Sequence, residues 1–411
     1  MTEPHAVVSG ASIAGLSAAF WLRRIGWRVT VLEKAKAFRD GGQNVDVRGV
    51  AHDVLDRMGL TEAIKKQNTT ETGTVLVNGS GAVVAELPSD GPDGATAELE
   101  VLRGDFAKSI LDSLPTDVEV GYGDPIASVE ERDDGVTVTT ESGRIVQADL
   151  LVIAEGVRSS TRDQLFGDQV DLRDLGITMV FGTIPRTSED DDRWRWYNTT
   201  GGRQVHLRPD NHGTTRAILA YADSADGDLV ALSHKQALAQ VRERFGDAGW
   251  EAARVLDAFD SSDDVYIDRL TQVRMPLWHR GRVCLVGDAA WCVTPLGGGG
   301  ASLALTSGYI LAAYLSGASA GGIEAALANY EEWLRPVVGD VQKLPPGLHH
   351  FAFPKTELGL KIRELFMKAL TSRPLAPLTA KFASVADTKQ QLPAITSPSA
   401  SVGPIADNLE H

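Results

Sequence analysis

The chain has 411 residues, well beyond the roughly 100 to 200 of one typical domain, so we expect two intertwined domains rather than a small disulfide scaffold. Forty basic and fifty-five acidic residues give a net charge of −15, which argues against nucleic acid or anionic membranes as partners. Cys284 and Cys292 are the only cysteines and lack metal-site spacing, and the N-terminus lacks a signal-peptide pattern. We therefore expect no metal and a cytoplasmic location.

The first forty residues predict a strand, a tight glycine turn, a helix and a second strand. Residues 6–9 and 27–32 are strand-like, and apolar residues recur at helical spacing over 13–25. Small residues in such a turn let the backbone approach a pyrophosphate, and an acid after the second strand accepts ribose hydroxyls. The motif predicts an FAD or NAD site. Its residues are Gly10, Ser12, Ala14, Gly15, Glu33 and Lys34.

Period-two patterns and turn residues predict the next elements. A hairpin is expected over 74–87, strands over 118–131 and 136–146, and a buried strand over 150–154. The region 171–275 is mostly strand-like and antiparallel. Its strands are expected at 177–184, 193–197, 204–207 and 214–221, and its helices at 235–245 and 250–259. A buried strand at 283–286 and helices at 303–315 and 323–334 follow.

These elements predict an α/β fold in which a Rossmann-like nucleotide-binding domain is interleaved with a mostly antiparallel β-sheet substrate domain, followed by C-terminal helices. The last segment ends in Leu-Glu-His, which is typical of a tag remnant. The expected segments are 1–72, 101–170 and 276–340 for the nucleotide-binding domain, 73–100 and 171–275 for the substrate domain, 341–383 for the helices, and 384–411 for the tail.

Two later motifs place an acid–glycine or glycine–acid pair at the end of a buried strand. The first is Glu155-Gly156, followed by Arg158 and Arg162, and the second is Gly287-Asp288 before a glycine-rich loop. Together with the N-terminal turn, and in this order, the set resembles the FAD-dependent aromatic hydroxylases, the single-component para-hydroxybenzoate hydroxylase-like monooxygenases. The resemblance covers about residues 5 to 340 and favours non-covalent FAD over NAD as the resident nucleotide.

The resemblance implies a role for each matching residue. Asp288 would bind the ribityl hydroxyls, Arg103 would lie along the phosphates and ribityl chain, and Arg48 would lie beside the flavin. The N–H groups at the start of the following helix would face the flavin pyrimidine. The implied cofactor residues after Lys34 are Arg48, Arg103, Asp288, Pro295, Gly298, Gly300 and Ala301.

The chain also departs from the family pattern. Glu155 stands where aspartate is usual, Gly299 for glutamine, Ser302 for asparagine and Ser307 for an acid, so their roles cannot be copied. Trp291 replaces a common histidine. It either fills the core, covers the flavin or lines the substrate pocket.

The predicted inserted sheet carries an aromatic cluster. Alternation sends Trp194 and Trp196 to one face and Arg195 and Tyr197 to the other, and the sequence does not say which face is inward. Simple packing of this domain is an equal alternative. Because the flavin does the chemistry, no catalytic residue is required. The substrate-pocket candidates are Trp194, Trp196, Tyr197, Tyr221 and Trp291, and the catalytic candidates are Arg48, His206 and Arg216.

The function that follows from the resemblance is an FAD-dependent monooxygenase. It would use NADPH or NADH and O2, and transfer OH from a flavin C4a-hydroperoxide to an aromatic, polycyclic or polyketide-like small molecule. A flavin-dependent reductase or halogenase on the same scaffold is one alternative. The altered positions keep a non-catalytic FAD-binding or ligand-binding protein as another.

Overall fold

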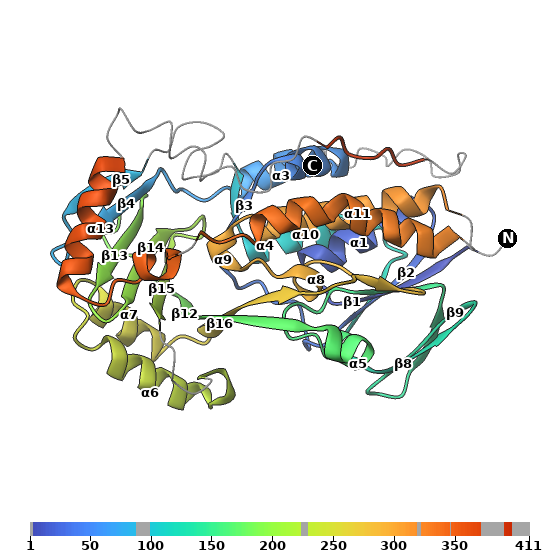
Figure 1. Ribbon diagram of the computed structural model, residues 1–411, viewed down its shortest axis with the longest axis horizontal. Coiled ribbons are helices and arrows are strands. Elements are labelled where there is room, and N and C mark those ends of the chain that lie inside the picture. Colours follow the sequence, from blue (N-terminus) through green and yellow to red (C-terminus); the bar gives the residue numbers. More distant parts are fainter. Residues whose placement is uncertain are drawn as a thin grey trace, which may run out of the picture.

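The computed structural model describes residues 3–87, 99–222, 229–318, 322–345, 347–370 and 390–396. These residues form one parallel-type sheet and one large mixed sheet that lie side by side, with two small sheets beside them (Figure 1). Helices cover both large sheets. The predicted α/β fold with an interleaved β domain is confirmed.

The parallel-type sheet has β1 at its centre. All residues of β1 and of its neighbour β11 are buried, and those of β11 are all apolar, because inner parallel strands are covered on both faces. Only β17 runs antiparallel to its neighbour. In spatial order, the strands are β17 (His279–Arg280), β18 (Val283–Leu285), β11 (Leu150–Ile153), β1 (His5–Ser9), β2 (Arg28–Glu33) and β7 (Glu119–Tyr122).

Helices pack around this sheet. Helices α1 and α10 pack closely together, and Gly308 permits this because a Cβ there would lie 2.5 Å from the Ser17 backbone. Ser17 Oγ donates to the Leu305 carbonyl at 2.6 Å. The helices are α1 (Ile13–Arg24), α2 (Val50–Met58), α3 (Thr61–Lys66), α4 (Arg103–Asp112), α5 (Ser160–Phe166), α8 (Asp288–Trp291), α9 (Thr294–Gly297), α10 (Gly300–Ser316) and α11 (Ile323–Val341), with the short turn η1 (Gly167–Gln169) after α5.

The large mixed sheet is formed by residues from two separate stretches of the chain. In spatial order, its strands are β16 (Tyr266–Arg274), β12 (Asp171–Pro185), β15 (Thr214–Ala222), β14 (Arg203–Pro209), β13 (Trp194–Thr199), β4 (Thr74–Val77) and β5 (Val83–Leu87). The expected hairpin β4–β5 therefore extends the edge of this sheet. It joins β13 in parallel, which the antiparallel pattern did not predict.

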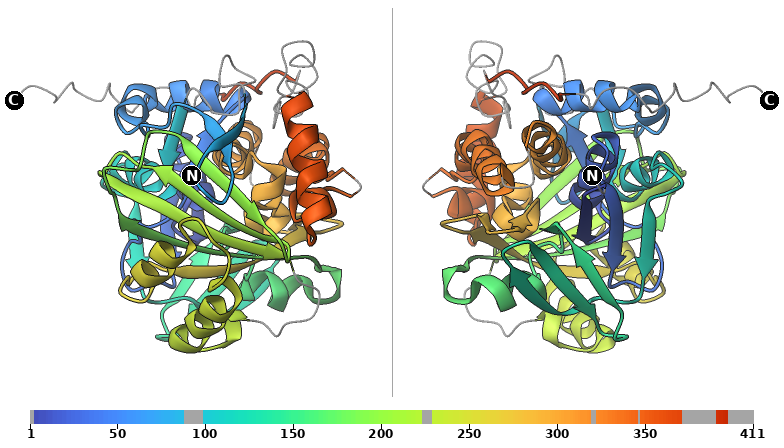
Figure 2. Two further views of the ribbon diagram at one scale, coloured as in Figure 1. Left: turned by 90° about the vertical axis from the view of Figure 1, so that its left-hand side faces the viewer. Right: turned by 90° about the vertical axis from the view of Figure 1, so that its right-hand side faces the viewer.

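One face of the mixed sheet is covered by α6 (His234–Phe245) and α7 (Ala252–Phe259), which follow η2 (Leu229–Ala231). We call this the outer face. Figure 2 shows α6 and α7 at one edge of the molecule and α2 and α3 at the opposite edge. The other face, which we call the inner face, packs against Leu296 of α9 and against the C-terminal helices.

Two smaller sheets complete the fold. The expected strand over 118–131 is divided, because its first half joins the parallel-type sheet as β7 and its second half turns away as β8. The antiparallel sheet consists of β10 (Ile145–Ala148), β9 (Gly135–Thr140) and β8 (Ile126–Arg132). The other pair is β3 (Asn44–Val47) with β6 (Leu99–Leu102), which the sequence analysis did not predict.

The C-terminal region contains α12 (Leu348–Ala352) and α13 (Glu357–Leu370). Residues 371–383 of the expected helical region lie outside the described residues. Residues 390–396, which belong to the expected tail, dock on α10 and α11. Tyr309 Oη donates to the Pro393 carbonyl at 2.7 Å, Trp333 Nε1 donates to the Gln391 carbonyl at 3.4 Å, and Leu392 and Ile395 pack on the core. Among the described residues, no helix is both long and apolar enough to cross a membrane.

Candidate cofactor and substrate site

The β1–α1 turn depends on two glycines. Gly10 has φ +110°, and a Cβ there would lie 2.4 Å from the Ala154 carbonyl oxygen. A Cβ on Gly15 would lie 1.9 Å from the Gly10 carbonyl oxygen, so only glycine lets α1 start this close to β1. Ser12 is the N-cap of α1 but makes no side-chain cap hydrogen bond. The first-turn N–H groups are thus oriented as an anion site requires.

Glu33 lies at the end of β2, directly beside this turn. Its carboxylate accepts hydrogen bonds from the N–H groups of Ala11 and Ala35, both at 2.8 Å. These two bonds fix the acid at the place where the predicted motif needs a ribose partner. Lys34 is exposed next to it.

Arg103 and Asp288 come from distant parts of the chain and meet at the same turn. Arg103 is the first residue of α4, and its Nη2 donates to Ser12 Oγ at 3.1 Å. Asp288 is the first residue of α8 and remains accessible, although protein surrounds it closely. Desolvation by this surrounding protein raises the pKa of Asp288, and the Arg103 guanidinium opposes the rise. Gly287, the residue before Asp288, lies against the first turn of α1, because a Cβ there would be 2.6 Å from Ala14 Cβ. Ser12, Arg103 and Asp288 therefore lie around the same turn.

The glycine-rich loop leads into α10 beside the same group. Gly298 and Gly299 both have φ +66°, and Gly299 is the N-cap of α10 without a side-chain cap. Ser302 accepts the Arg48 backbone N–H at 2.9 Å and donates to the Asp46 carbonyl at 3.0 Å. The serine that replaces the usual asparagine thus joins α10 to β3. Pro295, Gly300 and Ala301 lie in the same loop and first turn.

Thr294 was missed by the sequence analysis. It is buried, its φ is +64°, and its Oγ1 has no hydrogen-bond partner among the described residues. A β-branched residue with positive φ costs about 1–3 kcal/mol and persists mainly at functional sites. The only sequence signal was the following Pro295.

Glu155 has a clear structural role. Its carboxylate accepts hydrogen bonds from Ser9 Oγ at 2.5 Å, Ser159 Oγ at 2.7 Å, and the N–H and Oγ1 of Thr161 at 3.1 and 2.6 Å. The longer acid therefore ties the end of β1 to the start of α5. Nearby, the fully buried Arg162 donates to the Ala289 carbonyl at 3.2 Å and so supports α8.

The inner face of the mixed sheet carries the two tryptophans. The rings of Trp194 and Trp196 stack with centroids 5.5 Å apart, and the Arg208 guanidinium lies 4.0 Å from the Trp194 ring centroid. His206 lies beside both indoles; Trp194 Nε1 is 3.3 Å from its Nδ1, and Gln204 Oε1 is 3.0 Å from its Nε2. Burial lowers the pKa of His206 well below its usual range, so the ring is neutral at pH 7. These contacts fix the His206 ring between the two indoles and Gln204, and its catalytic role stays a prediction.

Tyr197 and Tyr221 are corrections to the predicted substrate pocket. Both lie on the outer face, because strand alternation turns them away from Trp194 and Trp196. Tyr197 Oη donates to the Ala248 carbonyl at 2.9 Å, and Tyr221 packs edge-on against Phe245. They belong to the hydrophobic core beneath α6 and α7.

Arg216 is also a correction. Its side chain forms an ion pair with Asp210 at 3.0 Å and donates to Thr183 Oγ1 at 2.7 Å. This network holds the ends of β12 and β15 together, so Arg216 is not available for the predicted catalytic role. Tyr266, which the sequence analysis missed, stacks on Phe181 of the inner face with ring centroids 4.8 Å apart. Although Tyr266 is partly exposed, desolvation by the protein packed around it raises its pKa to about 12, and Arg103 opposes the rise.

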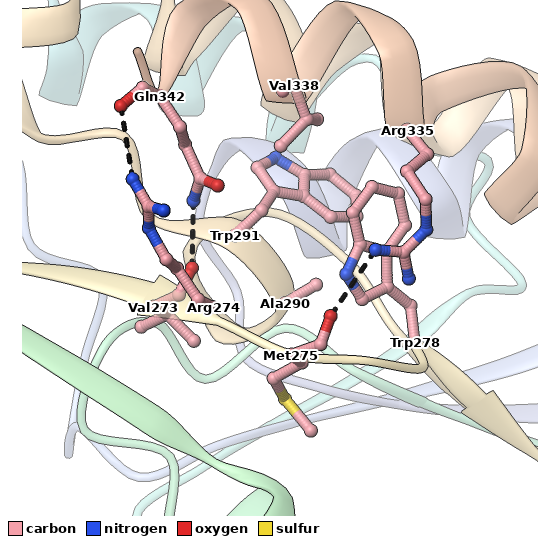
Figure 3. Close-up of a pocket in the computed structure, with 10 residues that line it drawn as sticks. Val273, Arg274, Met275, Trp278, Ala290, Trp291, Arg335, Val338 and Gln342 are labelled. Carbon is pink, nitrogen blue, oxygen red and sulfur yellow. Dashed lines mark hydrogen bonds between the residues drawn. The ribbon is translucent and has the colours of Figure 1, made fainter. Parts of the chain in front are cut away.

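Trp291 occupies the core next to α11. Its ring centroid lies 4.4 Å from the ring centroid of Trp278 and 6.3 Å from that of Tyr330. It also lines a pocket of about 220 Å³ between β16, α8 and α11, where Arg335 reaches toward the Met275 carbonyl (Figure 3). Of the three alternatives for Trp291, these contacts support core packing, and they place it away from the predicted pocket residues Trp194 and Trp196. The pocket residues are Val273, Arg274, Met275, Trp278, Ala290, Trp291, Arg335, Val338, Gly339 and Gln342.

A buried charge cluster joins β3 and β6 to the inner face. Arg208 contacts Glu71 and Glu100, both at 2.9 Å, and Arg48 contacts Asp46 at 3.1 Å. Carboxylates in this cluster thus outnumber guanidinium groups by one. Burial, partly offset by Arg208, raises the pKa of Glu71 to about 7.

This raised pKa predicts a pH-dependent stability. The folded protein holds the Glu71 proton more tightly than the unfolded chain does, so the associated stability is present below pH 4.5 and is lost as pH rises toward 7. In Glu71→Gln, the free energy of unfolding should therefore fall less between these pH values, by up to about 3 kcal/mol, than in wild type. Denaturant unfolding at pH 5 and pH 8 measures the effect. The exposed Glu62→Gln is the control, and equal pH dependence in wild type and Glu71→Gln would contradict the prediction.

Comparison with known proteins agrees with this geometry. A family model described as an FAD binding domain matches residues 3–343. A flavin-dependent monooxygenase of Legionella longbeachae is 33% identical over 364 residues, which cover 87% of this chain and 92% of that protein. The chain belongs to the FAD-dependent aromatic hydroxylase family. It is a flavin-dependent monooxygenase by family, and FAD binding follows from the same match.

Solved structures show the same fold. The crystal structure of the tetracycline destructase Tet(55) is 29% identical, with a TM-score of 0.79 and coverage of 95% of this chain and 99% of that one. Klebsiella pneumoniae R204Q HpxO complexed with FAD has a TM-score of 0.74 at 21% identity, covering 93% of this chain and 98% of that one. At 21% identity, the similarity to HpxO is evidence for the fold and not for a shared activity.

Proposed function

We propose that the protein uses NADPH or NADH and O2 to hydroxylate a flat aromatic, polycyclic or polyketide-like small molecule. The observation that carries the proposal is the convergence of Ser12, Arg103 and Asp288, from three distant segments, beside the glycine turn at the start of α1.

We also propose a cytoplasmic location. Both cysteines are free, which supports it.

The residues present fit FAD. In this proposal the first turn of α1 and Arg103 hold the pyrophosphate, Glu33 the ribose and Asp288 the ribityl hydroxyls, because each offers the matching donor or acceptor. The uncapped start of α10 would donate N–H groups to the flavin ring. When bound, FAD would carry two electrons from NAD(P)H to O2, so that one oxygen atom enters the substrate and the other leaves as water.

The inner face supports a flat substrate. Trp194 and Trp196 are stacked there with an interplanar angle of 9°, and Tyr266 is 38% exposed on the same face. Aromatic walls favour planar rings, and closure around them would exclude water from the reaction. The sequence is 29% identical to that of the tetracycline destructase Tet(55), so tetracycline is one polycyclic substrate to test.

The test is substrate-stimulated NAD(P)H consumption by the FAD-loaded protein. Tetracycline and a set of phenols and hydroxynaphthalenes would each be supplied with NADPH or NADH in air. We expect at least one to accelerate NAD(P)H oxidation and to yield a product heavier by one oxygen atom. Oxidation without oxygenated product would support a reductase, and a halide-dependent mass change a halogenase. FAD binding without NAD(P)H oxidation would leave a ligand-binding protein; each of these three results contradicts the proposal.

The two faces of β13 should respond differently to substitution. Trp194→Ala and Trp196→Ala should weaken substrate affinity and increase hydrogen peroxide release per NAD(P)H, while FAD content stays unchanged. Tyr197→Ala should lower stability by about 3 kcal/mol or more, because it empties the core beneath α7. Coupling and melting temperature of the three variants check this. A loss of coupling in Tyr197→Ala with none in the two tryptophan variants would contradict the assignment of the inner face.

A further inference from the structure

Helix α13 lies beside β5 and β13, at the edge of the inner face (Figure 1). It places the side chain of Arg363 against that face. The Arg363 guanidinium lies 5.5 Å from the Trp196 ring centroid and 6.0 Å from that of Phe351. The residue is only 8% exposed. This is a charged group buried against aromatic rings.

Arg363 has no hydrogen bond and no ion pair to any residue in the part of the chain that the structure describes, and its Nε is buried without a partner. Burial lowers its pKa to about 10, so the guanidinium is still charged at neutral pH. An unpaired buried cation is costly. Its cation–π contacts offset only part of that cost.

Other buried arginines of the protein are satisfied. Arg208 contacts Glu71 and Glu100, and Arg162 donates to two backbone carbonyls and pairs with Asp163. Arg363 therefore differs from both, since the described residues around it supply aromatic faces and no acceptor. Among the described residues, the component missing beside Arg363 is an anion.

A second donor beside Arg363 also lacks an acceptor among the described residues. Trp196 Nε1 is buried without a hydrogen-bond partner, on the same indole that the guanidinium covers. His206, next to this indole, is neutral and supplies no negative charge. Among the described residues, two unsatisfied donors thus lie together on the inner face.

We propose that Arg363 binds an anionic oxygen, a carboxylate or an ionised enol, carried by the flat substrate that the inner face accepts. The proposal rests on the proposed function for the position of the substrate. A charge-assisted hydrogen bond to the guanidinium would orient the ring, and the in-plane Nε1–H of Trp196 would donate a further hydrogen bond to the same anionic group. The substrate class is therefore acidic rather than neutral.

The test compares one acid with its neutral ester on the oxidised, FAD-loaded protein without NAD(P)H. The probes are 3-hydroxy-2-naphthoate and methyl 3-hydroxy-2-naphthoate, with affinity measured by calorimetry. The variants are Arg363→Met, Arg363→Lys and the control Lys361→Met, which changes an exposed cation on the same helix. We expect wild type and Lys361→Met to bind the acid at least tenfold more tightly than the ester. Arg363→Met should lose this preference, and Arg363→Lys should retain part of it.

A purely structural role for Arg363 predicts a different result. The melting temperature of Arg363→Met without ligand should then fall, whereas removal of an unpaired buried cation should leave it unchanged or higher. Equal affinity of wild type for the two probes, no binding of the acid, or an intact preference in Arg363→Met would each overturn the proposal. Binding needs no turnover, so acid preference without NAD(P)H oxidation would contradict the proposed function alone.

Discussion

Asp288→Ala should weaken FAD binding about ten- to a hundredfold, because a hydrogen bond from a hydroxyl to a carboxylate contributes roughly 1.5–3 kcal/mol. Asp288 is held at the start of α8, where its charge interacts with the Arg103 guanidinium. Arg103→Ala should act similarly through the phosphates. Fluorescence of released flavin during reconstitution of the apoprotein gives the dissociation constants.

Asp112→Ala is the matched control, since Asp112 is an exposed acid on α4 that pairs with Lys108. It should bind FAD like wild type. If Asp288→Ala and Arg103→Ala also retain wild-type affinity, the cofactor does not follow the path from Ser12 to Asp288.

Gly15→Ala should give a protein without flavin and with a lower melting temperature. The added Cβ would lie 1.9 Å from the Gly10 carbonyl oxygen, a backbone atom that no side-chain rotation can move. The start of α1 would therefore shift away from β1. The expected cost is at or above the roughly 1–3 kcal/mol of ordinary overpacking. Flavin absorbance per protein and calorimetric unfolding measure both effects.

Gly339→Ala provides the comparison at a glycine with free space. Among the described residues, no atom outside its own helical turn lies within 4 Å of the position that a Cβ would take, and the residue is inside α11. Alanine there should leave FAD content unchanged and stabilise the helix by about 0.5–1 kcal/mol. A Gly15→Ala protein as yellow and as stable as Gly339→Ala would show that the close β1–α1 approach is unnecessary.

The sequence predicted the features that local pattern determines. The strand–turn–helix at Gly10, the strand end at Asp288 and the opposite faces of Trp196 and Tyr197 follow from spacing alone, because period two and period 3.6 are local properties. That Arg103 and Asp288 lie beside the glycine turn at Ser12 could be predicted only from the family resemblance.

Other features depend on packing between distant segments. Alternation could not say which face of β13 meets α7, so Tyr197 was assigned to the pocket although it lies in the core. No sequence motif marks Arg363. It stands out only in the structure, because the described residues around it and Trp196 supply no acid. The positive φ of Thr294 likewise has no sequence pattern beyond the following proline.

The most direct test of the central claim is the origin of the oxygen in the product. The FAD-loaded protein would be incubated with NAD(P)H and an accelerating substrate under 18O2 in ordinary water, and the product analysed by mass spectrometry. A flavin-dependent monooxygenase incorporates one atom of the labelled oxygen, so the product should be heavier than that formed in 16O2 by the mass of one isotopic replacement. A product that carries no label, or a substrate recovered unchanged after NAD(P)H has been consumed, would contradict the account.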